Sequence, residues 1–265
     1  MTDSAPTAAG GTLNDPLAQL TGPLAGTTRM HLEVVESRRL TPGMQRLVLT
    51  APELASLENQ PGQDVMLMVD TDAGRPVRRR YTIRALDRGL RLLTLEVVRH
   101  GDGPGERWVA AAGPGDQIEG IGPRGKIFLA EAADWHLFIG DFSALPAFFA
   151  MAGALPAGSR ALVILEVPDP ADEQELATRA AAGLTWLHQL GRPAGDPSAL
   201  VAAAAAAALP ADGRGHAYLA GEAGVVLALR ETLAARGLTP EQISPKAYWG
   251  LGRANAPHGE PARDA

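Results

Sequence analysis

The chain contains no cysteine among its 265 residues, so disulfides, thiolate metal ligands, iron–sulfur clusters and a cysteine nucleophile are excluded. Any redox chemistry would therefore need a bound cofactor. Positive charge is not in excess, and the net charge of -6 argues against nucleic acid as a partner. No stretch reaches the ~18 consecutive apolar residues of a membrane span, and no basic segment with an apolar core begins the chain. These absences predict a soluble, cytoplasmic protein without membrane insertion.

The length and composition predict two folded domains. With 46% hydrophobic residues, a chain of 265 residues suffices for two domains of ordinary size. The first residues are rich in Ala, Gly, Thr and Pro and lack periodicity, which predicts an arm without a fold of its own. The predicted parts are a flexible arm over 1–28, a barrel domain over 29–130, an α/β domain over 131–253 and a C-terminal tail over 254–265.

Short segments rich in Val, Leu, Ile and Thr predict an antiparallel barrel in the first half. Pro-Gly pairs at 42–43, 61–62 and 114–115 separate several of them as turn signals. Six short strands with few helices are typical of a barrel. The predicted strands are 31–35, 45–49, 64–69, 80–84, 92–98 and 117–119.

From about residue 131 the pattern changes to strands that alternate with helices, which predicts a parallel sheet of nucleotide-binding type. A helix is predicted through Gly153, and further Ala-rich or Leu-rich helical segments, including the alanine run 202–208, are predicted between the later strands. A barrel followed by such a sheet is similar to the ferredoxin reductase architecture, with FAD on the barrel and a nicotinamide nucleotide on the α/β half. The predicted strands are 137–139, 161–167, 185–187 and 217–220.

The segment RRRYTIR at 78–84 predicts a strand bracketed by cations. A flavin dinucleotide needs an aromatic ring against its isoalloxazine, a hydroxyl near its reactive N5 region and cations on its pyrophosphate. Arg79 and Tyr81 would share one face of the strand, with Thr82 beside them. The alternative is a solvated basic edge strand that blocks sheet aggregation.

A glycine-rich turn follows in VVRHGDGPGERW at 97–108. The preceding strand ends at His100, and residues 106–112 can open a helix whose free N–H groups point back at the turn. An anion such as pyrophosphate requires this geometry. The alternative is an ordinary Gly-Pro turn with a structural histidine.

Together the two segments resemble the siderophore-interacting protein family, in which an RxYT strand precedes an HGxGPxxxW turn. GPRG at 122–125 lies where the family has it, and GDFSALPA at 140–147 resembles the family's GDxTALPA turn. AGEAGVVLALRETL at 220–233 and KAYWGLGRANAPHGE at 246–260 resemble its GE helix and its terminal KxYWxxG segment. The resemblance extends over most of the chain, from about Met30 to Glu260.

The resemblance implies a flavin site built from both halves. Without it, the turn at 140–147 is a capped helix without a ligand, Lys246 is a surface charge, and the aromatic pair after it belongs to the core of a final strand. The implied cofactor-binding residues are Arg79, Tyr81, Thr82, Arg84, Val98, His100, Gly103, Pro104, Gly105, Trp108, Gly140, Asp141, Ser143, Ala144, Tyr248 and Trp249.

The resemblance also implies Lys246 as a substrate contact, and Arg253 is expected to be a second one that substitutes for a basic residue missing after the YW pair. Gly250 stands where the family usually has a basic residue, which would alter the substrate preference. No side chain is expected to act as acid, base or nucleophile, so no catalytic residue is assigned. The histidines outside these motifs lack a second ligand at metal spacing, so no metal site is predicted.

The implied activity is reduction of Fe(III) in a siderophore by NADH or NADPH through FAD, with release of Fe(II). Glu166 and Asp169 near the end of a strand favour a free ribose hydroxyl and therefore NADH, while a ferredoxin is another possible donor. The expected partner is a ferric siderophore, and the expected state is a monomer. Two alternatives stay open: a general flavin or ferredoxin-type NAD(P)H oxidoreductase, and a non-enzymatic siderophore-binding protein.

Overall fold

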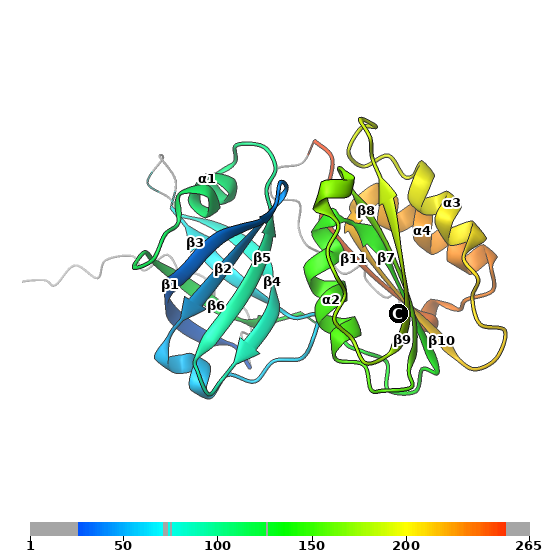
Figure 1. The fold of residues 1–265 in the computed structure, drawn as a ribbon, viewed down its shortest axis with the longest axis horizontal. Coiled ribbons are helices and arrows are strands. Elements are labelled where there is room, and N and C mark those ends of the chain that lie inside the picture. The colour runs from blue at the N-terminus through cyan, green and yellow to red at the C-terminus, as the bar shows by residue number, and fades with distance from the viewer. Residues whose placement is uncertain (1–25, 71–73, 75, 126, 253–265) are drawn as a thin grey trace, which may run out of the picture.

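The computed structural model describes residues 26–70, 74, 76–125 and 127–252, and shows a barrel and an open sheet side by side (Figure 1). The barrel strands are all antiparallel to their neighbours and close in the order β1-β2-β5-β4-β3-β6. The predicted six-stranded barrel is confirmed. Its strands are β1 (Thr28–Thr41), β2 (Met44–Thr50), β3 (Asp64–Val69), β4 (Val77–Asp87), β5 (Leu92–Val98) and β6 (Gln117–Arg124).

Alternation along the strands fills the barrel with apolar side chains. In β1, Met30, Leu32 and Val34 are buried while the residues between them face solvent. After β2, the turn η1 (Pro52–Ala55) adds a buried leucine to the same core. Helix α1 (Pro104–Ala111) packs on this core through Val109, which fixes the helix beside the end of β5.

The second half is the predicted parallel sheet, which is confirmed. The strand order is β11-β10-β7-β8-β9, and every neighbouring pair is parallel. Its strands are β7 (Trp135–Asp141), β8 (Arg160–Val167), β9 (Ala181–His188), β10 (Gly215–Glu222) and β11 (Ile243–Trp249). Its helices are α2 (Leu145–Gly153), α3 (Ser198–Ala206) and α4 (Ala223–Ala235), and short turns η2 (Phe142–Ala144), η3 (Pro170–Asp172) and η4 (Pro240–Gln242) accompany them.

One predicted helix is absent from the described residues. The connection from β8 to β9 contains only η3 and otherwise no regular structure, although the alanines at its end and at the start of β9 favour a helix. Pro168 and Pro170 lack the N–H groups that a helix needs. The Thr178 hydroxyl donates a 2.6 Å hydrogen bond to the Ala152 carbonyl near the end of α2. Contact with α2 therefore overrides the local preference for a helix.

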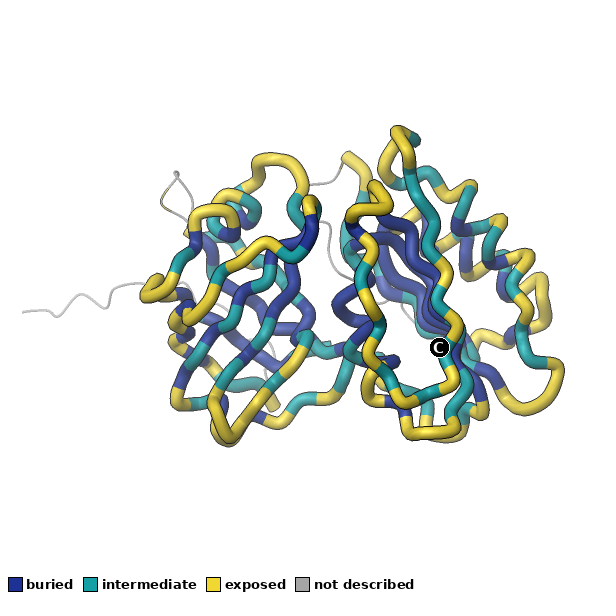
Figure 2. The backbone as a smooth tube through the Cα atoms, viewed as in Figure 1, coloured by how far each residue is buried: buried dark blue, intermediate teal, exposed yellow. Residues whose placement is uncertain are grey.

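The two halves share an interior along a seam. Helix α2 lies between the barrel and the sheet, while α3 and α4 cover the other face of the sheet (Figure 1). Met44 of the barrel is buried in the same core as Phe138 and Phe142 of the sheet half. The Arg84 guanidinium of β4 lies 5.9 Å from the centroid of the Phe149 ring on α2. Figure 2 shows the buried residues continuing through α2 between the two halves.

The strand order reverses beside β7, so the carboxyl ends of β7 and β10 border a crevice of the type that binds nucleotides. Gly140 lies at this point, and a Cβ added to it would lie 2.1 Å from the Ala220 carbonyl oxygen. Only glycine allows the two strand ends to approach so closely.

The predicted domain boundaries stay predictions. The predicted C-terminal tail and nearly all of the predicted N-terminal arm lie outside the described residues. No helix in the described part of the chain is long and apolar enough to cross a membrane.

Candidate functional site

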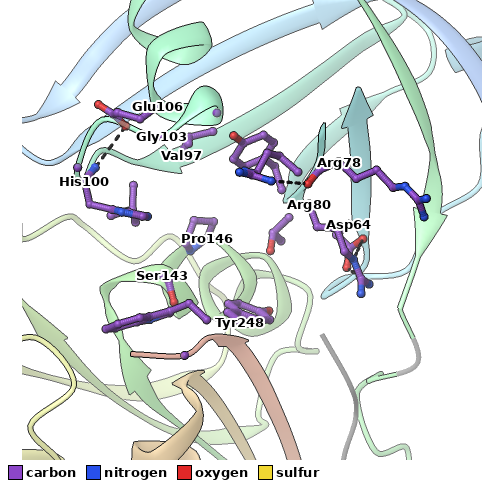
Figure 3. Close-up of a pocket in the computed structure, with 18 of the residues that line it drawn as sticks. Asp64, Arg78, Arg80, Val97, His100, Gly103, Glu106, Ser143, Pro146 and Tyr248 are labelled. Carbon is purple, nitrogen blue, oxygen red and sulfur yellow. Dashed lines mark hydrogen bonds and ion pairs between the residues drawn. The ribbon is translucent and has the colours of Figure 1, made fainter. Parts of the chain in front are cut away.

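A cavity of about 600 Å³ lies in the seam between the barrel and the sheet (Figure 3). Strands β4 and β5, the turn after β5 and helix α1 form its barrel wall. Residues of η2, α2 and β11 form the opposite wall. The size is in the range of small-molecule and cofactor sites, and the lining comes from both halves of the fold.

The barrel wall presents Arg79 and Tyr81 from one face of β4. A Cβ added to Gly105 would lie 2.7 Å from the Tyr81 hydroxyl oxygen and 3.0 Å from Arg79 Cγ, so both side chains meet the start of α1. Burial raises the pKa of Tyr81 to about 12. The Tyr81 hydroxyl is therefore a neutral hydrogen-bond donor at neutral pH, with Thr82 buried next to it in sequence.

Glu106 fixes the turn between β5 and α1. Its carboxylate accepts hydrogen bonds from Arg99 Nε at 2.8 Å and from the His100 backbone N–H at 3.2 Å. Gly103 is the N-cap residue of α1, no side chain caps the helix, and a Cβ at Gly103 would meet nothing within 4 Å. The N-terminus of α1 therefore borders open space, as an anion site requires.

On the sheet side a buried carboxylate holds the end of β11. Asp141 accepts hydrogen bonds from the Ser143 backbone N–H at 2.9 Å, the Ser143 hydroxyl at 2.5 Å, the Glu222 N–H at 2.8 Å and the Trp249 indole N–H at 2.9 Å. Burial raises the pKa of Asp141, and these donors oppose the rise. The Glu222 carboxylate in turn accepts from the Leu251 N–H at 3.0 Å. Both carboxylates thus fix the segment after β11 at the crevice.

Cations gather around one carboxylate at another part of the lining. Asp64 accepts hydrogen bonds from the Arg80 guanidinium at 2.9 and 2.5 Å and lies 3.3 Å from Lys246 Nζ. Lys246 Nζ lies 5.2 Å from the centroid of the Tyr248 ring. Burial and the neighbouring Arg80 lower the pKa of Arg124, which pairs with Asp64 in the β3–β6 register. Three cations near one carboxylate give a local excess of positive charge, and of these cations Arg80 and Lys246 line the cavity.

The lining fits FAD. It offers the Tyr81 ring and hydroxyl for an isoalloxazine, and Arg79 beside the open N-terminus of α1 for a pyrophosphate. The open space at Gly103 lets a phosphate approach the backbone. Across the described residues, no group of three or more His, Asp or Glu side chains could hold a metal ion.

Comparison with known proteins identifies the family. Residues 133–252 match the family model of siderophore-interacting proteins, and residues 68–127 match that of the siderophore-interacting FAD-binding domain. The crystal structure of a siderophore utilization protein from T. fusca superposes with a TM-score of 0.80 at 32% identity, covering 88% of this chain and 97% of that chain. The chain belongs to the siderophore-interacting protein family. The predicted family is thus confirmed.

Two further relatives of this siderophore-interacting protein carry names that state a reaction. Ferric vibriobactin reductase ViuB of Vibrio cholerae is 29% identical, with 84% of this chain and 89% of the relative covered. The NADPH-dependent ferric-chelate reductase of Escherichia coli is 26% identical, with 83% of this chain and 92% of the relative covered. The relatives thus include proteins named as reductases of chelated ferric iron.

Most predicted site residues line the cavity: Arg79, Tyr81, Thr82, Val98, His100, Gly103, Gly105, Ser143, Lys246, Tyr248 and Trp249. Others lie behind the lining. Arg84 lies 3.3 Å from the Glu96 carboxylate, and Asp141 holds Trp249. Pro104 is the first residue of α1.

Three predicted residues serve packing instead of the cavity surface. Trp108 packs on the barrel core and lines a separate, smaller cavity, while Gly140 and Ala144 lie in the interior of the sheet half. Arg253 lies outside the described residues.

The cavity also contains residues that the sequence did not single out: Asp64, Arg78, Arg80, Glu96, Val97, Gly101, Asp102, Glu106, Pro146, Leu251 and Gly252. Gly250 also lines it. Arg78 and Arg80 belong to the RRRYTIR segment, so a local signal existed for them. Asp64 had none, because only the pairing of β3 with β4 brings it to Arg80.

Tyr81 and Tyr218 are expected to ionise late, because burial raises the pKa of each from 10.0 to about 12. Between these values the unfolded state binds fewer protons, so the free energy of unfolding falls as the pH rises from about 10 to about 12. A phenolate absorbance titration should show two late-ionising phenols, and Tyr81→Phe and Tyr218→Phe should each remove one. Ionisation of all phenols near 10.0 would contradict this expectation.

Proposed function

We propose that the protein is a ferric-siderophore reductase that passes electrons from a nicotinamide dinucleotide, through FAD, to siderophore-bound Fe(III), and so releases Fe(II). The observation that carries this proposal is the seam cavity, which combines a lining suited to FAD with the cations around Asp64. The family assignment and the names of the relatives support it.

The side chains of the cavity bind and orient. Arg79 and the first N–H groups of α1 would hold the pyrophosphate, while Tyr81 and Thr82 would face the isoalloxazine. Bound FAD supplies the conversion between a two-electron donor and the one-electron acceptor Fe(III). Asp141 holds Trp249 at the carboxyl ends of β7 and β10, where the nicotinamide nucleotide would dock. No side chain has to act as acid or base.

The cationic part of the lining suits the substrate. Hydroxamate and catecholate oxygens are hard anionic donors that bind Fe(III) far more tightly than Fe(II), so reduction releases the iron. Lys246 and Arg80 of the lining, together with Arg124 outside it, outnumber the carboxylate of Asp64, and this local excess would attract an anionic ferric siderophore. Gly250 adds no charge at the position where the family usually has a basic residue. The cations near Asp64 would therefore supply the attraction for the anionic siderophore.

We infer that the donor is NADH, from the carboxyl edge of the sheet. Glu166 lies at the end of β8, next to Asp141 in the β7–β8 register, where an acidic side chain suits a free ribose hydroxyl. Arg192 donates a 2.6 Å hydrogen bond to Glu166 and lies 3.9 Å from Asp196. Two carboxylates already balance the positive charge of Arg192. An added 2′-phosphate would therefore meet negative charge that is not compensated.

Glu166→Gln is expected to move the preference toward NADPH. The loss of one negative charge should lower the NADH-to-NADPH ratio of kcat/KM for flavin reduction by about tenfold. Glu231→Gln, the same change on an exposed position of α4, is the control and should leave the ratio unchanged. A wild-type protein that prefers NADPH, with no change in the Glu166 variant, would refute the assignment of the donor.

The function is tested by an anaerobic assay with purified protein, FAD, NADH, a ferric siderophore and a ferrous-specific chelator. We expect the ferrous complex to form only when all components are present. An excess of added free flavin should not lower the rate at which the complex forms. A general flavin reductase would instead reduce free flavin in preference. A non-enzymatic siderophore-binding protein would remain colourless after incubation with FAD.

A further inference from the structure

A buried carboxylate joins the two halves of the molecule. Asp172 is the last residue of η3, after β8, and is 2% exposed. Its Oδ1 accepts hydrogen bonds from the Thr41 hydroxyl at 2.6 Å and from the Gly43 backbone N–H at 2.7 Å. Thr41 and Gly43 form part of the tip of the β1–β2 hairpin, so both bonds cross from the sheet half to the barrel half.

The hairpin tip fits this place closely. A Cβ added to Gly43 would lie 2.8 Å from a ring carbon of Phe142 and 3.0 Å from Asp172 Oδ1. The next residue, Met44, is fully buried in the same core as Phe142. The tip is therefore held by a carboxylate on one side and by the interior of the sheet half on the other.

The hairpin tip is bonded in turn to the flavin side of the cavity. The Gly43 carbonyl accepts a 2.8 Å hydrogen bond from the Arg99 backbone N–H, at the start of the glycine-rich turn. Arg99 Nε and the His100 backbone N–H both donate to Glu106. A continuous series of contacts thus leads from Asp172 to residues that line the cavity.

We propose that Asp172 is a positioning residue for electron transfer from the nicotinamide nucleotide, because it fixes the sheet half relative to the flavin-binding turn. This inference rests on the proposed function, in which the barrel holds the flavin and the sheet holds the nucleotide. Transfer between them depends steeply on placement, and an error of about 1 Å can cost about 100-fold in rate. Arg79, Tyr81 and α1 all belong to the barrel, and Asp172 contacts none of them.

Asp172→Ala removes both bonds that cross the seam. At saturating NADH, we expect flavin bleaching to slow by about tenfold or more, with an unchanged Kd for FAD and unchanged reduction by dithionite. Asp172→Asn keeps an oxygen that can accept both bonds, and should restore the rate to within about twofold. Asp134→Ala is the control, because Asp134 holds a turn of the sheet half through a 2.7 Å bond from the Arg214 N–H, at the opposite end of the sheet from the carboxyl edge.

A second readout needs neither flavin nor turnover. In the flavin-free protein, Asp172→Ala should speed hydrogen exchange at the Gly43 amide, whereas Asp134→Ala should not. Thr41→Val removes one of the two bonds and should speed Gly43 exchange by a smaller factor. If Asp172→Ala does not fold, the Thr41 variant provides the test. Wild-type bleaching rates and unchanged Gly43 exchange in Asp172→Ala and Thr41→Val would overturn the inference. Failure of NADH and NADPH to bleach the wild-type flavin would overturn the proposed function instead, while Gly43 exchange would still decide whether Asp172 holds the seam.

Discussion

Exchanging Arg79 for glutamate is expected to weaken FAD binding by about 100-fold. The side chain of Arg79, on β4, lies against the start of α1, because a Cβ added to Gly105 would lie 3.0 Å from Arg79 Cγ. The substitution removes a cation and places a carboxylate beside the N–H groups proposed to hold the pyrophosphate, so attraction becomes repulsion. Titration of flavin-free protein with FAD, followed by quenching of flavin fluorescence, gives the Kd.

The control is the same charge reversal at Arg88, in the turn between β4 and β5. The Arg88 side chain is 56% exposed and lies 3.8 Å from Glu58, outside the cavity lining. Its replacement by glutamate should leave the Kd for FAD within about twofold of the wild-type value. Equal losses in both variants would show that overall charge sets the affinity, and an unchanged Kd in Arg79→Glu would remove Arg79 from the flavin site.

Replacing Lys246 with methionine is expected to lower kcat/KM for an anionic ferric siderophore by about tenfold or more. Flavin reduction by NADH should be unchanged. Lys246 is 6% exposed, and methionine fills a similar volume without charge. Arg80 continues to satisfy Asp64 through its two hydrogen bonds. The change therefore removes one positive charge from the cations near Asp64, where the siderophore is proposed to bind, while the packing is kept.

The charge of the chelate separates the two explanations of such a loss. A ferric tricatecholate is strongly anionic, whereas a ferric trihydroxamate is neutral, so the loss in Lys246→Met should be larger for the tricatecholate. Lys246→Arg keeps the charge and should retain most of the activity. Equal losses with both chelates would mean that Lys246 supports the structure and does not attract the substrate.

Local periodicity explains why most of the fold could be predicted. The buried positions Met30, Leu32 and Val34 alternate along β1, and the apolar run of β8 marks a strand covered on both faces. The segment after η3 could not be predicted in this way. Its composition favours a helix, but Pro170 and the contact of Thr178 with α2 oppose a helix there.

The site residues likewise divide into those whose arrangement follows from local sequence and those brought together only by the tertiary fold. Arg79 and Tyr81 share a strand face by the two-residue repeat, so their arrangement follows from the sequence. Asp64 meets Arg80 across 16 residues and Lys246 across 182, and only closure of the barrel and docking of β11 bring them together. Lys246, predicted as a substrate contact, is therefore also the partner of a buried carboxylate. Asp172 escaped prediction for the same reason.

Transfer of electrons through FAD to siderophore-bound Fe(III) is tested most directly by an anaerobic single turnover. FAD-loaded protein is bleached with one equivalent of NADH and then mixed with a ferric siderophore and a ferrous-specific chelator. We expect the absorbance of oxidised flavin to return while about two ferrous ions appear per flavin. A flavin that stays bleached while no ferrous complex forms would contradict the proposed reductase activity.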